Sequence, residues 1–300
     1  MRLFLKIVMG LIVIVVLLAG VLLIPPHLQT LRVEPPLPSE AELRALLAVE
    51  NGPVGVRYLN TSSQRGPNGG AGHNVFVIEW AGGELFMIDA GMDRATAAEF
   101  SRLIEFAMGA SAAEIHGSVA ELLGDDIERI TGVAFTHLHI DHTQGVLAFC
   151  EARGEGARRY QTRWQAELHN FNTVEGAAIV AQSCLQPGEL SGGNILTAEG
   201  FPGLGIVGLG GHTPGSTLFA AAIDDRLWLF SGDTTNSKAN LLNNVGKGFL
   251  YSNILVPENT GRTEALRLWL TGLDANDDMT VVVSHDLADI EGSGMAEYQR

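Results

Sequence analysis

The chain has 300 residues, of which 46% are hydrophobic, and its 19 basic and 34 acidic side chains give a formal net charge of −15. Because nucleic-acid binding depends on Lys and Arg side chains that neutralise phosphates, this charge argues against a nucleic-acid partner. Two cysteines in 300 residues exclude a disulfide scaffold. The composition therefore predicts a folded, acidic protein with a core large enough to be stable without cross-links.

The first 25 residues differ from the rest of the chain. Residues 7–24 form an uncharged apolar run, IVMGLIVIVVLLAGVLLI, preceded by Arg2 and Lys6. As a helix this run would span roughly 27 Å, close to the thickness of the hydrocarbon core of a bilayer. It is longer than the core of a cleaved signal peptide and lacks a clear cleavage site. We therefore favour an uncleaved transmembrane signal anchor at residues 1–25, with a cleaved signal peptide and a buried core helix as alternatives. The two basic residues favour a cytoplasmic N-terminus and a periplasmic or otherwise extracytoplasmic domain.

Residues 26–50 are predicted to connect this anchor to the folded domain. The segment PPHLQTLRVEPPLPS contains five prolines, a composition typical of an extended tether. Ser39 lies three residues before Glu42, which is the capping-box pattern of a helix N-terminus. A Pro-rich tether followed by one short helix is therefore expected.

Residues 51–300 are predicted to form one domain of mixed strands and helices. Hydrophobic patterning predicts strands at 54–60, 74–80, 84–90, 130–136, 204–209, 217–223, 226–231 and 279–284, and helices at 93–108, 111–123 and 263–272. Strands and helices mixed in this order are typical of a layered α/β architecture. Residues 150–203 are less periodic and rich in glycine, and we expect them to form an insertion or a lid.

A dense group of histidines follows the strand predicted at 130–136. The sequence THLHIDH places His137, His139, Asp141 and His142 within six residues. Imidazole nitrogens and carboxylate oxygens are ligands that zinc and similar divalent ions prefer. Alternate side chains of an extended segment share a face, so the first two histidines can bind one metal ion. This spacing predicts a metal site.

Three further candidate ligands come from distant segments, each at the end of a predicted strand. His212 lies in GGHTPGS, Asp233 lies in SGD, and His285 lies in SHD. Functional groups collect where strands end and loops begin in layered α/β sheets. We therefore expect these three side chains to join the histidine cluster.

These motifs resemble those of the metallo-β-lactamase superfamily over roughly residues 52–290. The matching pieces are IDAG at 88–91, THLHIDH at 136–142, GGHTPGS at 210–216, SGD at 231–233 and SHD at 284–286. The resemblance implies that residues 51–300 form a catalytic domain with a four-layer αββα sandwich. It also implies a dinuclear metal centre at one edge, with zinc as the expected metal and iron or manganese as alternatives.

The same resemblance assigns roles to individual side chains. It implies that one metal ion is held by His137, His139 and His212, that the other is held by Asp141, His142 and His285, that Asp233 bridges them, and that Asp89 supports the metal loop without binding metal. Two adjacent metal ions produce a bridging hydroxide at neutral pH and polarise the substrate. No Ser or Cys nucleophile is then required, and the chain contains no G-x-S-x-G motif. Asp141 is the candidate catalytic residue that accepts and passes on the proton.

The resemblance is to the lactonase-like branch of this superfamily. An aspartate at position 233 differs from the pattern of true metallo-β-lactamases. The acidic domain is a poor match for the branches of the superfamily that process nucleic acids. The branch implies hydrolysis of a lactone or ester bond in a small, acyl-bearing substrate. β-Lactamase, thioesterase or phosphodiesterase activity, and a non-catalytic or iron-redox role, stay open as alternatives.

Substrate contacts and covalent links are less defined by the sequence. Six side chains either wall a substrate pocket or pack as ordinary core residues: Tyr160, Trp164, His169, Phe171, Phe249 and Tyr251. Cys150 and Cys184 can form a disulfide if the domain lies outside the cytoplasm.

Overall fold

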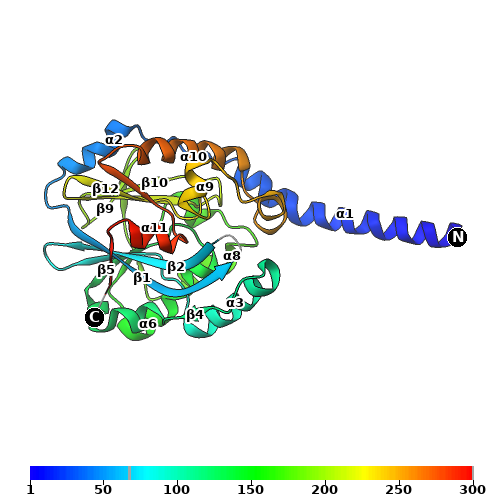
Figure 1. The fold of residues 1–300 in the computed structure, drawn as a ribbon, viewed down its shortest axis with the longest axis horizontal. Coiled ribbons are helices and arrows are strands. Elements are labelled where there is room, and N and C mark those ends of the chain that lie inside the picture. The colour runs from blue at the N-terminus through cyan, green and yellow to red at the C-terminus, as the bar shows by residue number, and fades with distance from the viewer. Residues whose placement is uncertain (67–68, 299–300) are drawn as a thin grey trace.

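Two mixed β-sheets pack face to face, and helices cover both outer faces (Figure 1). The structure is a computed structural model that describes residues 1–66 and 69–298. The four-layer αββα sandwich and the long apolar helix ahead of it, both expected from the sequence, are confirmed.

The first sheet lies on one side of the sandwich, and its strand order is β14-β1-β2-β3-β5-β6-β7, with β4 paired to β1. Within the described residues its strands are β1 (Pro53–Gly66), β2 (Gly69–Trp80), β3 (Leu85–Ile88), β4 (Glu114–Ile115), β5 (Ile130–Ala134), β6 (Arg158–Tyr160), β7 (Gln186–Pro187) and β14 (Ala296–Glu297). Strands β3, β5 and β6 run parallel, so their carboxyl ends lie at the same edge of the sheet.

The second sheet has the strand order β13-β12-β11-β10-β9-β8. Its strands are β8 (Leu190–Gly192), β9 (Leu196–Ala198), β10 (Leu204–Gly208), β11 (Thr217–Ile223), β12 (Arg226–Phe230) and β13 (Met279–Val282). Strands β12 and β13 are parallel neighbours, so the loops that follow them leave the sheet side by side.

Apolar side chains at alternate positions of each strand face opposite sides of the sheet, and together they form the core. In β2, Phe76 and Ile78 pack between the sheets, whereas Val75 and Val77 face the helices on the outer side. Strand β11 alternates in the same way, with Phe219 between the sheets. Both faces of each sheet are therefore buried, which is why these strands are almost continuously apolar.

Helices form the two outer layers. The first sheet is covered by α3 (Arg94–Met108), α4 (Val119–Leu123), η2 (Gly124–Arg129), α5 (Ile140–Thr143), α6 (Val146–Arg153) and α8 (Val174–Gln182). The second is covered by α2 (Glu40–Arg44), η1 (Ala45–Ala48), α9 (Lys238–Leu242) and α10 (Thr260–Asp274). Shorter helical segments are α7 (Arg163–Glu167), η3 (Tyr251–Leu255) and α11 (Leu287–Gly292). The capping box predicted for Ser39 and Glu42 is present at the start of α2.

Helix α1 (Arg2–Leu31) contains the predicted anchor and extends beyond it. Its most apolar 18-residue window has a mean hydropathy of 3.4 and contains no buried residue, so α1 is a candidate membrane span. The prediction of an extended tether is wrong for residues 26–31, because the helix continues through Pro25 and Pro26. The ring of an interior proline removes a backbone hydrogen bond. Contacts between the last turn of α1 and the folded domain stabilise the helix there: His27 Nε2 lies 3.0 Å from the Asn253 carbonyl.

Two other expectations need correction. Residues 111–123 were expected to be one helix, but α4 begins only after Ser118, whose capping box fixes the helix start, and residues 114–115 form strand β4. The segment 150–203 is not a separate insertion or lid. It supplies strands β6 to β9 at one end of both sheets, together with α7 and α8. Short strands in glycine-rich sequence lack the periodicity that prediction relies on.

Candidate metal centre

The candidate metal centre lies where four strands end at one edge of the sandwich. The THLHIDH segment follows β5, His212 follows β10, Asp233 follows β12, and His285 follows β13. The parallel pairing of β12 with β13 brings the last two together. The fold therefore converts four separate sequence motifs into a single cluster.

All seven predicted metal-ligand side chains meet in this cluster. The Nε2 atom of His137 lies 3.0 Å from the Nδ1 atom of His139. The Nε2 atoms of His142 and His285 lie 3.3 Å apart. Asp233 lies between the two halves, because its Oδ1 atom is 3.1 Å from His285 Nε2 and its Oδ2 atom is 3.7 Å from His212 Nε2.

Donor atoms in this cluster form three groups, two of which share His137, and in each group one ligand atom per residue lies within 4.8 Å of the others. The groups are His137 with His139 and His212, His137 with His142 and Asp233, and His73 with Asp141 and His285. The first group matches one predicted ligand set. The second predicted set, Asp141, His142 and His285, is divided between the other two groups.

The donor set fits divalent metal ions on a structural criterion. Four buried atoms that face the cluster have no hydrogen-bond partner among the described residues: His73 Nδ1, His139 Nε2, His212 Nε2 and Asp233 Oδ1. Buried polar atoms are rarely left without a partner, so each of these atoms needs an explanation. A cation held by imidazole and carboxylate groups provides one.

Acceptors outside the cluster hold three of the histidine rings. The Nδ1 atom of His142 lies 2.9 Å from Asp89 Oδ2, that of His212 lies 2.5 Å from Glu258 Oε1, and that of His285 lies 2.8 Å from the Gly72 carbonyl. An acceptor at Nδ1 selects the tautomer whose Nε2 lone pair is free for a metal ion. The Nε2 atoms of all three rings face the cluster, as metal binding requires.

Asp89 holds the loop that carries the histidines. Its carboxylate accepts hydrogen bonds from the backbone N–H of Thr136, at 2.7 Å, and from the Thr136 hydroxyl. Asp89 is completely buried and has a positive φ of 63°, a conformation that costs free energy for any residue other than glycine. Its contacts match the supporting position expected for it, although its role remains a prediction.

The charges of the cluster set its proton occupancy. Burial lowers the pKa of His142, but the carboxylates of Asp141 and Asp89 outweigh burial and raise it to about 10. Burial and the nearby His212 lower the pKa of His139 to about 3. Burial raises the pKa of Glu258, but its hydrogen bond with His212 and the charge of Lys247 bring it down to about 2. His142 is therefore protonated at neutral pH in the absence of metal, whereas His139 is neutral.

Sequence reasoning missed three side chains of this site: His73, Lys247 and Glu258. The Nζ atom of Lys247 lies 3.4 Å from Asp233 Oδ2 and 3.7 Å from Glu258 Oε1, and the lysine side chain is only 2% exposed. His73 Nδ1 lies 3.5 Å from Asp141 Oδ2. None of the three belongs to a recognised motif. The only signal was the presence of single polar residues inside apolar or glycine-rich segments.

Among the six aromatic and imidazole side chains considered for a substrate pocket, Tyr251 is the one that contacts the cluster. Its ring is nearly parallel to that of His212, with centroids 6.4 Å apart, and Lys247 lies over its face. Tyr160 is instead buried between the sheets, where its hydroxyl donates to the Glu199 carbonyl. Phe249 is 75% exposed. The remaining three, Trp164, His169 and Phe171, lie in or after α7.

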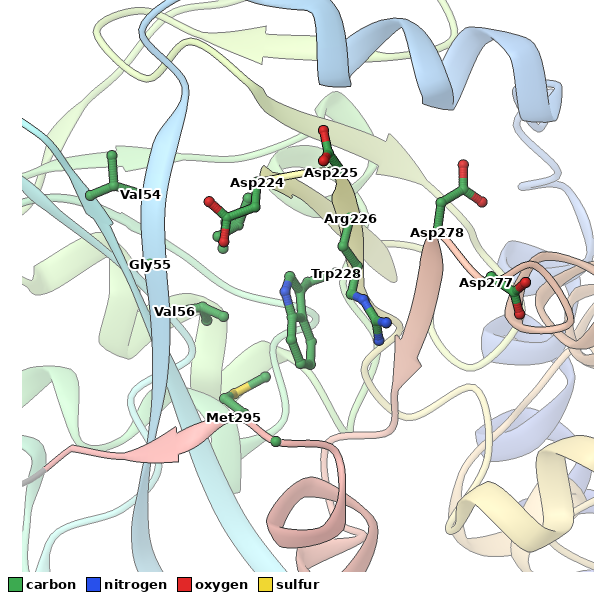
Figure 2. A pocket seen from close by; sticks show the side chains of 12 residues that line it. Val54, Gly55, Val56, Asp224, Asp225, Arg226, Trp228, Asp277, Asp278 and Met295 are labelled. Atoms are coloured by element: carbon green, nitrogen blue, oxygen red, sulfur yellow. The ribbon is translucent and has the colours of Figure 1, made fainter.

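A separate cavity of about 640 Å³ lies at the opposite end of β12 and β13 (Figure 2). Trp228 and Met295 line it, and acidic residues at the turns before these two strands surround it. Asp233 and His285 follow the other ends of the same strands. This cavity is therefore not part of the metal centre.

Comparison with known families identifies the fold and the class of protein. The profile of the metallo-beta-lactamase superfamily matches residues 68–285, and the chain belongs to this superfamily. Membership of this superfamily confirms the expectation of a metal-dependent hydrolase. The structure also contains groups of His and Asp side chains that could hold a metal ion. No match was found among curated protein sequences.

Solved structures with the same fold include lactone hydrolases. An N-acyl homoserine lactone hydrolase with N-hexanoyl-L-homoserine at its catalytic metal centre has a TM-score of 0.59 and 14% identity, covering 82% of this chain and 98% of its own. A probable metal-dependent hydrolase from Staphylococcus aureus has a TM-score of 0.55 and 16% identity, covering 79% of this chain and 91% of its own. AidC, a dizinc quorum-quenching lactonase, has a TM-score of 0.51 and 15% identity, covering 83% of this chain and 80% of its own. At these identities the likeness establishes a shared fold.

Proposed function

We propose that the chain is a dinuclear metal-dependent hydrolase that opens or cleaves a lactone or ester bond in a small, acyl-bearing substrate. The observation that carries this proposal is the convergence of seven His and Asp side chains with buried, unpaired donor atoms. The similar structures that are lactone hydrolases support the choice of substrate class.

The two halves of the cluster would each hold one metal ion. His137, His139 and His212, which the structure groups together, would form one half. Asp141, His142 and His285 would form the other: Asp141 is grouped with His285, and His142 Nε2 lies 3.3 Å from His285 Nε2. Asp233 presents one oxygen toward each half and is the proposed bridge. When bound, the metal ions would lower the pKa of a shared water and polarise the substrate carbonyl.

Asp141 is the proposed proton acceptor. Burial raises the pKa of its carboxyl, but the charge of His142 and the nearby His73 imidazole lower it further than burial raises it. The carboxylate is therefore ionised at neutral pH and can accept a proton. His73 and His285, both near Asp141 Oδ2, keep the carboxylate in position.

We infer that α1 anchors this enzyme in a membrane with the catalytic domain on the extracytoplasmic side. The apolar run is long enough to span a bilayer, and none of it is buried against the domain. Cys150 and Cys184 form a disulfide in the structure, with their Cα atoms 5.5 Å apart. Disulfides persist mainly in oxidising compartments, which supports this location.

The test is a hydrolysis panel on the purified full chain, with metal content measured on the same preparation. We expect about two divalent ions per chain and turnover of lactones or esters. His139→Ala should lose metal and hydrolysis together, whereas His116→Ala, an exposed histidine outside the cluster, should keep both. Turnover of phosphodiesters without lactones or esters would replace the proposed substrate class, and full activity of His139→Ala would refute the site.

A further inference from the structure

The end of α1 is fixed against the segment that walls the metal centre. His27 Nε2 lies 3.0 Å from the Asn253 carbonyl in η3. Two residues later in α1, Gln29 Nε2 donates to the His169 carbonyl at 3.2 Å. Asn172 Nδ2 donates to the Leu255 carbonyl and so links the two loop segments to each other. The last turn of α1, η3 and residues 169–172 therefore form one connected unit.

This unit and the residues next to it carry several large apolar side chains that are exposed. We call this set the loop surface, and it consists of Phe171, Val174, Phe249, Leu250, Ile254 and Leu255. Phe249 is 75% exposed, Leu250 68% and Leu255 59%. Single exposed apolar residues are ordinary, but several large ones on linked segments are typical of an interaction site.

The charge around the loop surface differs from that of the chain as a whole. The segments 25–33, 168–174 and 245–257 contain no Asp or Glu, although the chain has 34 acidic residues among 300. Apart from histidines, their charged residues are Arg32 and Lys247. Exposed Glu34, Glu167 and Glu175 border these segments, so it is the segments themselves that lack the acidic groups that anionic headgroups of a bilayer would repel.

The position of α1 sets the height of the loop surface above a membrane. If residues 7–24 span the hydrocarbon core, His27 lies about 5 Å beyond its boundary at a rise of 1.5 Å per residue. Asn253 contacts His27, so η3 lies at the same height, within the headgroup layer. Apolar side chains in this layer are buried to a depth of about 5–10 Å in membrane-surface proteins. Figure 1 shows α1 leaving the sandwich beside this segment, drawn in orange ahead of α10.

The same segment contacts the metal centre from its inner side. Tyr251, in η3, lies against His212, and Lys247, four residues earlier, contacts Asp233. Only the thickness of this segment therefore separates the loop surface from the candidate metal ligands.

We propose that the loop surface inserts into the headgroup layer of the bilayer that α1 spans, so that the metal centre receives acyl-chain substrates dissolved in that bilayer. The inference rests on the proposed function, since it requires both the anchor and a hydrolase. It deepens that function by naming the source of the substrate. The partner surface is a phospholipid bilayer.

The test uses the full chain in phospholipid nanodiscs of phosphatidylcholine and phosphatidylglycerol. Because both native cysteines are paired, a single introduced cysteine is the site that reacts with an environment-sensitive fluorophore. Leu250→Cys reports on the loop surface, and Leu17→Cys reports on the apolar run. Val54→Cys is the matched control, since Val54 is 55% exposed and lines the cavity at the far end of the sandwich. Lipids with a nitroxide at the headgroup quench a probe in the headgroup layer, and lipids with a nitroxide near the end of the acyl chain quench a probe at the bilayer centre, where position 17 lies.

We expect the probes at positions 250 and 17 to lose most of their emission and the probe at 54 to keep it. Quenching at 17 without quenching at 250 would overturn the inference and leave the anchor and the hydrolase standing. No quenching at 17 would refute the anchor and the inference together. Neither outcome depends on hydrolysis, so failure of the proposed reaction is a separate result.

A second measurement connects the surface to substrate supply. The double variant Leu250→Ser and Leu255→Ser should lower kcat/KM for a long-acyl lactone in nanodiscs by about tenfold, equivalent to roughly 1.4 kcal/mol of lost burial. The same variant should hydrolyse a water-soluble short-acyl lactone at the parent rate. An equal loss on both substrates would contradict supply from the bilayer.

Discussion

Glu258 fixes the orientation of His212, because its Oε1 atom lies 2.5 Å from Nδ1 of that ring and leaves Nε2 facing the cluster without a hydrogen-bond partner among the described residues. The second oxygen of Glu258 accepts from the Ser252 hydroxyl, so the carboxylate is itself held in place. A carboxylate of this kind raises the basicity of the imidazole that it contacts.

Glu258→Gln should therefore weaken metal binding while the fold is kept. Loss of a carboxylate behind a metal-ligating histidine lowers affinity by about 10–100-fold. Competition with a chromophoric chelator measures the affinity. Glu264→Gln is the control, since Glu264 is exposed on α10. Equal affinities in the two variants would argue against this role for Glu258.

Metal binding should release protons. Because Asp141 and Asp89 raise the pKa of His142 to about 10 against the effect of burial, the metal-free ring is protonated at pH 7. A metal ion binds the neutral imidazole, so binding displaces this proton, and apparent affinity should rise by about tenfold per pH unit between pH 6 and 8. Calorimetry in two buffers with different ionisation enthalpies counts the protons. A binding heat that is the same in both buffers would contradict protonation of His142.

Lys247 should stabilise the metal-free protein more than the metal-bound one. Its buried ammonium group lies beside Asp233 and Glu258. Removing it takes away a positive charge that offsets the negative charge of these two buried carboxylates. Lys247→Met should lower the free energy of unfolding by about 3–5 kcal/mol in the presence of a chelator. Bound metal ions supply positive charge at the same place, so the loss should shrink in their presence. Urea unfolding with and without metal measures both values.

The control for Lys247 is an exposed ion pair. Arg94 and Glu121 form a salt bridge with about half of each side chain exposed. Arg94→Met should cost about 0–1 kcal/mol whether or not metal is present. A loss for Lys247→Met that does not change on addition of metal would mean that the lysine acts through packing instead of charge.

Gly145 should not tolerate a side chain, because it lies against the loop that carries Asp89. A Cβ atom on Gly145 would lie 2.0 Å from the carbonyl oxygen of Ala90, which is backbone and cannot rotate away. Gly145→Ala should therefore destabilise the protein by about 1–3 kcal/mol and weaken metal binding. Gly272→Ala is the matched control, since Gly272 lies in α10 with nothing within 4 Å of its Cβ position. It should be neutral or stabilising by up to about 1 kcal/mol, and melting temperatures would distinguish the two.

The part of the site that could be predicted consists of residues in short, dense motifs. His137, His139 and His142 lie on one loop after a buried strand, so their proximity follows from the sequence alone. The pairing of β12 with β13, which brings Asp233 to His285, depends on long-range contacts. The sequence indicated only that each of these side chains follows a predicted strand and lies in a motif that resembles a known family. The structure places these side chains together, and their role as metal ligands remains a prediction.

The residues that escaped prediction act through tertiary contacts. Glu258 is 46 residues from His212 in the chain, and no local pattern marks it as a partner of that histidine. Lys247 resembles an ordinary loop lysine in the sequence, and only the folded chain shows that it is buried. The helical state of residues 26–31 was missed for the same reason. Local propensity favours an end at Pro25 and Pro26, whereas contacts with Asn253 and His169 extend the helix.

The uninterrupted helix α1 has a mechanical consequence. A flexible tether would let the domain tumble and sample many heights above a bilayer. A helix that runs without a break to the wall of the metal centre fixes both height and orientation instead. An enzyme held in this way searches for substrate by lateral diffusion in two dimensions. Its rate would then follow the number of substrate molecules per unit area of membrane, and dilution of the surrounding solution would leave it unchanged.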